Sequence, residues 1–171
     1  MHSSESFEQD VLPHLNSAYN LARWLTRDDQ NAQDIVQEAF LRAFKAYRGF
    51  RGGDARPWLM KIVRNVYYTS LQKKASHEFV DFEDDLLTDN QPSSNAEQLL
   101  INESNGHLVR KALEMIPPRS REILVLREVE SMSYKEISTI MEVPIGTVMS
   151  TLSRARARLR ECVTTLTNAA R

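Results

Sequence analysis

Residues Ser133 to Arg160 read SYKEISTIMEVPIGTVMSTLSRARARLR and decide the fold of the C-terminal part of the chain. Ser133 with Glu136 three residues later is a capping box, which starts a helix. Val143-Pro144 ends that helix, because the residue before a proline disfavours the α conformation. Gly146 is expected to allow the sharp turn that follows. The stretch therefore predicts two helices joined by a tight turn, the pattern of a helix-turn-helix.

The second helix of this unit has an apolar face and a polar, cationic face. The apolar face carries Val148, Leu152, Ala155 and Leu159. The opposite face carries Thr147, Ser150, Thr151, Arg154 and Arg158. Polar side chains near the start of such a helix meet base edges, while arginines further along meet phosphates. The alternative is a basic amphipathic helix that is only solvated or that binds a protein. Four arginines within residues 154–160, with no acid among them, favour contact with DNA.

Bulk composition predicts an all-α protein of the cytoplasm. Glycine and proline are scarce in the 171 residues, at 5 and 6, and this favours helices. No apolar run reaches the ~18 residues of a membrane helix, and the N-terminus lacks the pattern of a signal peptide. We therefore expect no direct membrane insertion. Cys162 is the single cysteine, so neither an internal disulfide nor a zinc finger is expected.

Charge is distributed unevenly, although the formal net charge is -1. Residues 76–105 hold eight acids and no lysine or arginine, which leaves 22 basic against 15 acidic residues elsewhere. Basic segments around an acidic connector suit a polyanion-binding protein, although many acidic linkers are only solvated. We predict two small helical domains, 1–75 and 106–171, joined by a flexible acidic linker, 76–105.

Helical periodicity organises both predicted domains. We predict helices over Ser6–Thr26, Asn31–Tyr47, Pro57–Lys74, Leu108–Ile116 and Pro118–Val129. Pro13 kinks the first of these or sets its start, and Asp28 or Asp29 caps the second. Phe44 belongs to the apolar stripe of the second helix, and Trp58 is expected in the core. Residues 48–56 hold three glycines and form a loop.

The predicted helix over 57–74 has a second, polar face. That face carries Lys61, Arg64, Asn65, Tyr68 and Gln72, and the preceding loop adds Phe50, Arg51 and Arg56. Such a mixture of cations, amides and aromatic rings suits single-stranded or partly melted nucleic acid, because exposed bases stack while cations neutralise the backbone.

The predicted helix over 31–47 has a mixed polar face with one leucine in its middle. The face carries Asp34, Gln37, Glu38, Leu41, Arg42 and Lys45. A polar face centred on an apolar side chain suits docking of a partner protein. An ordinary solvated face is the alternative.

Three segments in order resemble the compact extracytoplasmic function (ECF) group of RNA polymerase sigma factors. Asp34 to Phe50, DIVQEAFLRAFKAYRGF, resembles the segment of that group that binds core polymerase. Arg56 to Lys74, RPWLMKIVRNVYYTSLQKK, resembles its promoter-melting and minus-ten-reading segment. Leu113 to Arg160 resembles its minus-thirty-five-reading domain, and the resemblance covers nearly the full length of the chain.

The resemblance implies a role for each matching position. Asp34, Gln37, Glu38 and Leu41 would dock on the clamp helices of the largest subunit of the polymerase. Phe50, Arg51, Arg56, Lys61, Arg64, Asn65 and Tyr68 would hold the opened minus-ten strand. Thr147, Ser150, Thr151, Arg154 and Arg158 would enter the major groove of promoter DNA at the minus-thirty-five element. The acidic linker would pass through the polymerase near its active-site and RNA-exit channels.

Three positions depart from the pattern of that group. Thr151 stands where the group often has arginine, and Thr69 and Gln72 stand where it often has aspartate and arginine. The promoter sequences preferred by typical members are therefore not transferred to this chain. The resemblance also implies control by an anti-sigma factor and a stress or envelope-response regulon.

The function implied is promoter-specific initiation of transcription by core RNA polymerase, with no catalysis, cofactor, metal or small-molecule substrate of its own. One alternative is a helix-turn-helix regulator that binds promoters as a dimer without polymerase. Such a regulator needs no basic, aromatic helix after a glycine-rich loop. A nuclease or recombinase is the other alternative, and it needs clustered carboxylates or a nucleophile with partners. The acids cluster in the linker instead, without the spacing of metal ligands.

Overall fold

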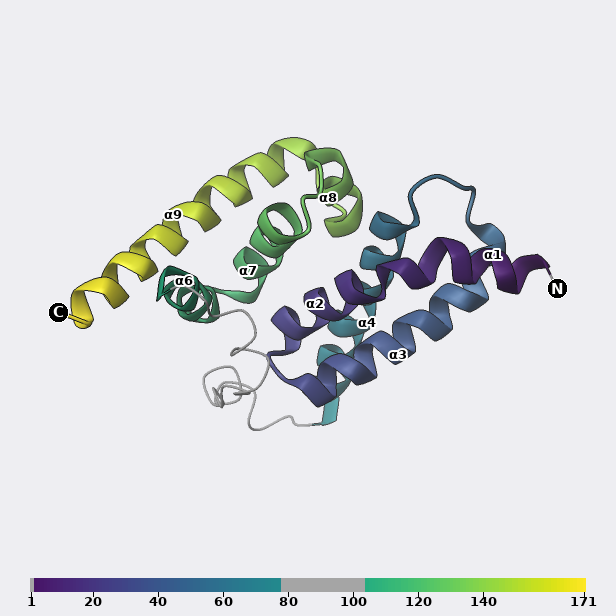
Figure 1. Cartoon of the computed structure of the whole chain (residues 1–171), viewed down its shortest axis with the longest axis horizontal. Helices are drawn as coiled ribbons and strands as arrows, with labels where there is room; N and C mark the ends of the chain where they lie inside the picture. Colours follow the sequence, from purple (N-terminus) through teal and green to yellow (C-terminus); the bar gives the residue numbers. More distant parts are fainter. Residues whose placement is uncertain (1, 78–103) are drawn as a thin grey trace. The chain divides into compact units, whose positions relative to one another are not determined.

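A computed structural model of the chain describes residues 2–77 and 104–171. These residues form two compact helical units, one within Met1–Pro92 and the other within Ser93–Arg171. Every regular element in the two described ranges is a helix (Figure 1). Most of the predicted linker, residues 78–103, lies outside the described residues. The domain boundaries at 75 and 106 remain predictions, since the flanking helices extend to His77 and begin at Ser104.

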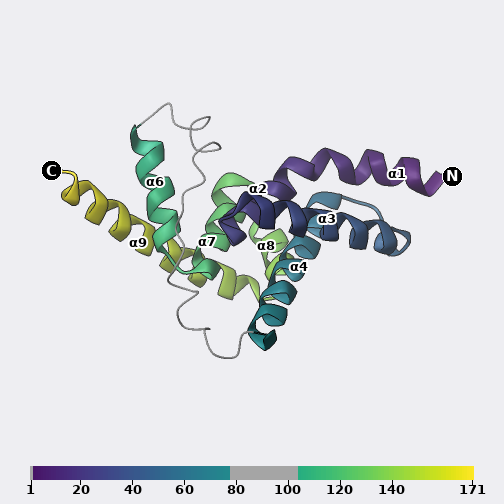
Figure 2. The ribbon, with the colours of Figure 1, turned by 90° about the horizontal axis from the view of Figure 1, so that it is seen from below.

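The N-terminal unit is a three-helix core with one additional helix. Its elements are α1 (His2–Val11), η1 (Leu12–His14), α2 (Leu15–Thr26), α3 (Asp29–Ala46), η2 (Tyr47–Gly49) and α4 (Ala55–His77). α2, α3 and α4 pack against one another in every pairing. α1 and α2 run nearly in line, with α3 alongside them and α4 crossing (Figures 1 and 2). Leu21, Leu59, Met60 and Val63 are fully buried in this core.

Pro13 divides the first predicted helix into two. It lies in the short 3-10 turn between α1 and α2, because proline has no N–H to donate and its ring collides with the preceding helical turn. The predicted cap of α3 is confirmed at Asp28, whose carboxylate accepts a 2.8 Å hydrogen bond from the backbone N–H of Asn31. α4 begins at Ala55 rather than at Pro57, since Asp54 accepts a hydrogen bond from the N–H of Arg56 and starts the helix earlier.

The C-terminal unit is built around one long helix. Its elements are α6 (Ser104–Met115), α7 (Pro118–Leu124), a π turn η3 (Val125–Val129), α8 (Tyr134–Met141) and α9 (Ile145–Ala169). α6, α7 and α8 each pack against α9 (Figure 1). Leu126, Ile137, Ile140 and Leu152 are fully buried among them. The packing therefore fixes the orientation of α9 within the unit.

Arg121 joins α7 to the end of α6. Its side chain is 3% exposed, and its guanidinium donates hydrogen bonds to the carbonyls of Leu113 (2.9 Å), Ile116 (3.1 Å) and Glu114 (3.3 Å). These carbonyls lie at the C-terminal end of α6, where a helix has no backbone partners for them. Arg121 of α7 thus supplies the hydrogen-bond donors that the last carbonyls of α6 lack.

The predicted helix-turn-helix consists of α8 and α9. The capping box is confirmed, with Ser133 N–H donating to Glu136 Oε1 at 2.9 Å and Glu136 N–H donating to Ser133 Oγ at 3.0 Å. The expectation for Gly146 is wrong, because Gly146 lies inside α9. The left-handed residue of the turn is Glu142, at φ 56°. Glu142 is held there because the next N–H, of Val143, donates to the carbonyl of Ser138.

Candidate nucleic-acid and docking surfaces

A shallow groove of about 390 Å³ runs along the polar face of α9. Its lining consists of Arg119, Ser120, Thr147, Thr151, Arg154 and Arg158. Four of these six are residues predicted to enter the major groove, and Arg119 and Ser120 come from the first turn of α7. Arg119, Arg154 and Arg158 are exposed. Ser150, the fifth predicted residue, is exposed but lies outside the groove.

Two other cations of the C-terminal unit are held by its own residues. Arg156 donates to Glu128 Oε1 from both Nε (2.9 Å) and Nη2 (2.6 Å), and the hydrogen bond raises the pKa of this guanidinium. Arg127 donates to the carbonyl of Met132 at 2.8 Å and lies 4.7 Å from the centre of the Tyr134 ring. Arg156 therefore links α9 to η3, and we assign it a structural role rather than one in DNA contact.

The predicted polar face of α4 lies on one continuous helix. Asn65 is exposed, while Lys61, Arg64 and Tyr68 are half-buried. The guanidinium carbon of Arg64 lies 4.6 Å from the centre of the Tyr68 ring, within the range of a cation–π contact. Tyr67 is buried, and its ring meets Tyr68 edge-on at 5.1 Å. Tyr68, the aromatic candidate on this face, is therefore held by its contacts with Arg64 and Tyr67.

The loop before α4 is shaped by glycines and an aromatic cluster. Gly52 and Gly53 have φ of 85° and 88°, which residues with a Cβ adopt only with strain. Phe50 packs against Trp58, with ring centres 4.9 Å apart, and stacks on Tyr47 at 5.8 Å. The expectation that Trp58 lies in the core is wrong, because its ring is half-buried at the edge of this cluster. Arg51 is exposed on the loop and Arg56 is half-buried in the first turn of α4.

The predicted docking face of α3 is exposed along its length. Asp34, Gln37, Glu38 and Leu41 all face solvent at helical spacing, and Leu41 is 58% exposed. Glu38 accepts a 2.9 Å hydrogen bond from Arg42 Nε, and this bond lowers the pKa of the Glu38 carboxyl. Leu41 thus lies beside a glutamate whose carboxylate is held in place by a hydrogen bond within the same helix.

Besides Trp58, sequence reasoning misplaced or missed three residues of these surfaces. Phe44, expected in the apolar stripe, is 52% exposed, although its ring forms a T-shaped pair with that of Phe7 from α1 at 5.3 Å. It lies three residues after Leu41, on the exposed side of α3. Arg119 and Ser120 belong to the α9 groove, although they lie some 30 residues before it in sequence. The Pro117-Pro118 helix start was the one available signal that placed them on an exposed first turn.

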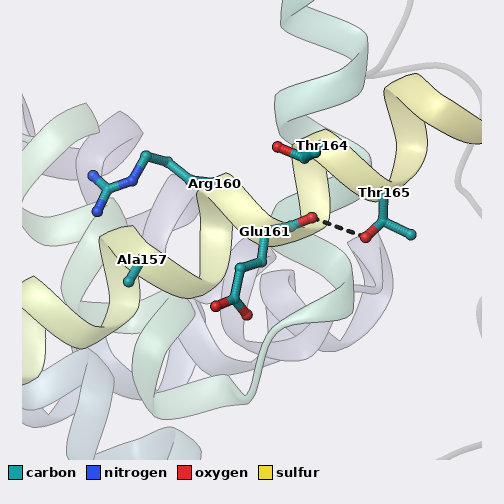
Figure 3. A pocket seen from close by; sticks show the side chains of 5 residues that line it. All are labelled: Ala157, Arg160, Glu161, Thr164 and Thr165. Atoms are coloured by element: carbon teal, nitrogen blue, oxygen red, sulfur yellow. Dashed lines mark hydrogen bonds between the residues drawn. The ribbon is translucent and has the colours of Figure 1, made fainter.

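A second hollow, of about 610 Å³, lies along the C-terminal half of α9. Ala157, Arg160, Glu161, Thr164 and Thr165 line it. All five belong to one helix, and their side chains diverge from it (Figure 3). Thr165 Oγ1 donates to the carbonyl of Glu161 at 2.9 Å. The hollow is larger than the groove but is lined by a single helix, whereas the groove brings together cations from α7 and α9. The groove is therefore the better candidate site.

Over 2–77 and 104–171, no cluster of three histidine, cysteine, aspartate or glutamate side chains is arranged to hold a metal ion. None of the described helices combines the length and the apolar character needed to cross a bilayer.

Both halves of the chain match known families. The family described as sigma-70 region 2 matches residues 11–77, and the family described as sigma-70 region 4 matches residues 107–159. The chain is 35% identical over 131 residues to the ECF RNA polymerase sigma-E factor of Escherichia coli K12, covering 72% of this chain and 69% of that protein. It is 31% identical over 163 residues to the RNA polymerase sigma-H factor of Pseudomonas aeruginosa, covering 88% and 82%.

One relative is considerably longer than the part that this chain matches. ECF RNA polymerase sigma factor SigE of Mycolicibacterium smegmatis is 29% identical over 156 residues, and the match covers 91% of this chain but 61% of SigE.

Solved structures give the same assignment of fold. The sigma factor RpoE in complex with the anti-sigma factor NepR, from Bartonella quintana, has a TM-score of 0.75 at 26% identity and covers 94% of this chain and 98% of that one. CnrH, in complex with the cytosolic domain of CnrY, has a TM-score of 0.66 at 22% identity and covers 95% and 90%.

Proposed function

Because this chain belongs to the extracytoplasmic function (ECF) group of RNA polymerase sigma factors, we propose that it is a dissociable subunit that directs core RNA polymerase to a set of promoters. Members of this family are transcription initiation factors and are not known as enzymes. We place the chain in the cytoplasm, where the polymerase works. It binds promoter DNA through two separate surfaces and the polymerase through a third.

The groove of the C-terminal unit carries the proposal. Thr147, Thr151, Arg154 and Arg158 of α9 line one groove with Arg119 of α7. In this arrangement the threonines, near the start of α9, meet base edges of the minus-thirty-five element. The arginines, further along α9 and on α7, neutralise phosphates on either side of it.

The N-terminal unit supplies the second DNA surface. The loop that contains Gly52 and Gly53 brings Phe50, Arg51 and Arg56 to the start of α4, and the polar face of α4 continues from there. The opened minus-ten strand lies along this surface, with its backbone near the cations. The domain assignment 1–75 and 106–171 follows from this division, and the acidic residues 76–105 connect the two.

The polymerase binds to the exposed face of α3. Leu41 is the apolar centre of this face and is surrounded by Asp34, Gln37 and Glu38. Burying an exposed leucine contributes about 1.5–3 kcal/mol, and the surrounding polar residues set the orientation. Phe44, next along the same helix and half-exposed, enlarges the apolar contact. The clamp helices of the largest polymerase subunit are the proposed partner.

An anti-sigma factor is the proposed regulator. RpoE of Bartonella quintana was solved with the anti-sigma factor NepR, and its structure matches 94% of this chain. A protein that covers α3 or the groove on α9 would keep this chain from the polymerase or from the promoter. The regulon we propose is one that answers stress or envelope damage.

Two matched variants test the separation of the surfaces. Leu41→Asp should weaken binding of the chain to core polymerase by about 100-fold or more, because it removes the leucine contact and places a charge there. Arg154→Glu with Arg158→Glu should abolish specific promoter binding and leave polymerase binding unchanged. Polymerase binding is measured by fluorescence titration with labelled chain, and promoter binding by mobility shift of the holoenzyme.

The control changes an exposed residue away from the three surfaces. Thr165→Asp, on the far half of α9, should leave both affinities at the wild-type level. Normal holoenzyme assembly by Leu41→Asp would refute the docking face. Equal loss of polymerase and promoter binding in the double arginine variant would refute the assignment of two separate surfaces.

A further inference from the structure

Two large apolar side chains project from the start of α9 into solvent. Ile145 is 46% exposed and Met149 is 54% exposed, while Val148 and Leu152 of the same helix are buried. A spacing of four residues places Ile145 and Met149 one above the other on the same flank of the helix. The residues that line the α9 groove lie on the other flank.

Small residues separate the two flanks. Gly146 and Ser150 lie between them on the outer edge of α9, and both are exposed. A Cβ placed at Gly146 would meet no atom within 4 Å, and the Ser150 hydroxyl turns back to donate to the carbonyl of Thr147 at 3.1 Å. Side chains on the outer edge of α9 therefore project little. A binding partner that lies against this edge can also contact the side chains on both flanks.

The apolar flank differs in charge from the flank of the groove. On the apolar flank the first arginine after Met149 is Arg156, two turns further along the helix. It is paired with Glu128 at 2.6 Å. The opposite flank presents Arg154 and Arg158 as exposed cations. Phosphates are therefore attracted to the groove side, and the side of Ile145 and Met149 suits an apolar group.

We propose that Ile145 and Met149 contact the methyl groups of thymines in the minus-thirty-five element, an inference that rests on the proposed function. In the major groove the thymine C5-methyl is the apolar group that a base pair presents, and aliphatic side chains recognise it by contact. Ser150, on the outer edge between the two flanks, belongs to the face proposed to read the bases, so the flank of Ile145 and Met149 borders that face. These two residues select A·T pairs, a choice that the arginines of the groove do not make, because arginine pairs best with guanine.

The test removes only the methyl groups. The holoenzyme of core polymerase and full-length chain first selects its preferred sequences from duplexes randomised across the minus-thirty-five region. The selected duplex is then made with deoxyuridine in place of thymidine, one position at a time, which preserves every hydrogen bond of the base pair. Wild-type holoenzyme should bind about fourfold more weakly for each methyl that contacts the protein, the loss expected for one buried methyl group.

Variants assign the lost contact to these residues. Met149→Ala should bind the thymine duplex more weakly than wild type and should no longer distinguish thymine from deoxyuridine at one position. Ile145→Ala should do the same at a neighbouring position. Arg154→Ala should weaken binding to both duplexes and keep the difference between them. Thermal melting confirms that the variants are folded, as expected for side chains that are about half exposed.

The outcomes separate this inference from the proposed function. Selection of no sequence at all by a folded holoenzyme would overturn the proposed function and this inference with it. Selection of a defined element, with equal affinity for thymine and deoxyuridine at every position, would overturn this inference alone and leave the flank to a protein partner. A thymine preference that survives in both Met149→Ala and Ile145→Ala would overturn it as well.

Discussion

Arg121→Met should destabilise the C-terminal unit and leave the stability of the N-terminal unit unchanged. Arg121 is 3% exposed and donates three hydrogen bonds to the carbonyls that end α6, at 2.9, 3.1 and 3.3 Å. Methionine retains the apolar stem but leaves these carbonyls without their donor. This loss lowers the stability of the packing that holds α9, and with it the affinity for promoter DNA.

The size of the effect follows from two opposing contributions. Hydrogen bonds to a charged donor contribute about 1.5–3 kcal/mol each, whereas removing a buried cation relieves a desolvation cost of several kcal/mol. Because three hydrogen bonds are lost, their combined contribution exceeds the desolvation cost that is relieved. We expect the free energy of unfolding to fall by about 3 kcal/mol. A unit of this size has a urea slope of about 1 kcal/mol per molar, so the unfolding midpoint should fall by about 2–3 M.

The chain offers a reporter for each unit. Both tryptophans, Trp24 and Trp58, belong to the N-terminal unit, so their fluorescence follows that unit alone. Far-UV circular dichroism follows the helices of both units. In Arg121→Met the dichroism should lose part of its signal at low urea, while the tryptophan transition stays at the wild-type midpoint.

A matched control lies two residues earlier in the same helix. Arg119→Met changes an exposed arginine of α7 and should alter stability by less than about 0.5 kcal/mol. If Arg121→Met left the dichroism transition unchanged, or moved the tryptophan transition equally, the proposed role of Arg121 in the C-terminal unit would be wrong.

Three further predictions concern the caps and charges of the two units. Ser133→Ala removes the capping box of α8 and should lower the stability of the C-terminal unit by about 1 kcal/mol, measured by the same urea titration. Arg42 lowers the pKa of Glu38 through their hydrogen bond, so the stability from this pair is present above the ordinary glutamate pKa and is lost as the pH falls through the lowered one. NMR titration should therefore show the pKa of Glu38 rising toward its ordinary value in Arg42→Ala, with Lys45 and Lys73 still lowering it. Arg158→Gln should reduce the slope of log affinity for promoter DNA against log salt by about 0.9, whereas Arg156→Gln should leave the slope unchanged.

Local signals were sufficient to predict the helix-turn-helix. A capping box acts between residues three apart, and a proline restricts the residue before it, so both can be read without knowledge of the fold. The residue that takes the left-handed conformation was not predictable in this way. Glu142 adopts it because Val143 N–H donates to Ser138, and this bond outweighs the conformational preference that pointed to Gly146.

The role of each arginine depended on contacts that the sequence does not show. Arg154, Arg156 and Arg158 are alternate residues of one basic stretch, yet Arg156 is paired with Glu128, which lies 28 residues away in sequence. Arg121 is buried, although arginine is seldom found there. Helical spacing predicts which face a residue occupies, but only the packing of other helices decides which cation is left available to contact DNA.

The most direct measurement of the central claim is run-off transcription with purified core RNA polymerase, full-length chain and genomic promoter fragments. The chain should direct initiation from defined start sites, and addition of Leu41→Asp in its place should produce no specific transcript. Absence of specific initiation by a folded wild-type chain, free of inhibitor, would contradict the proposal that it is a promoter-selecting subunit of the polymerase.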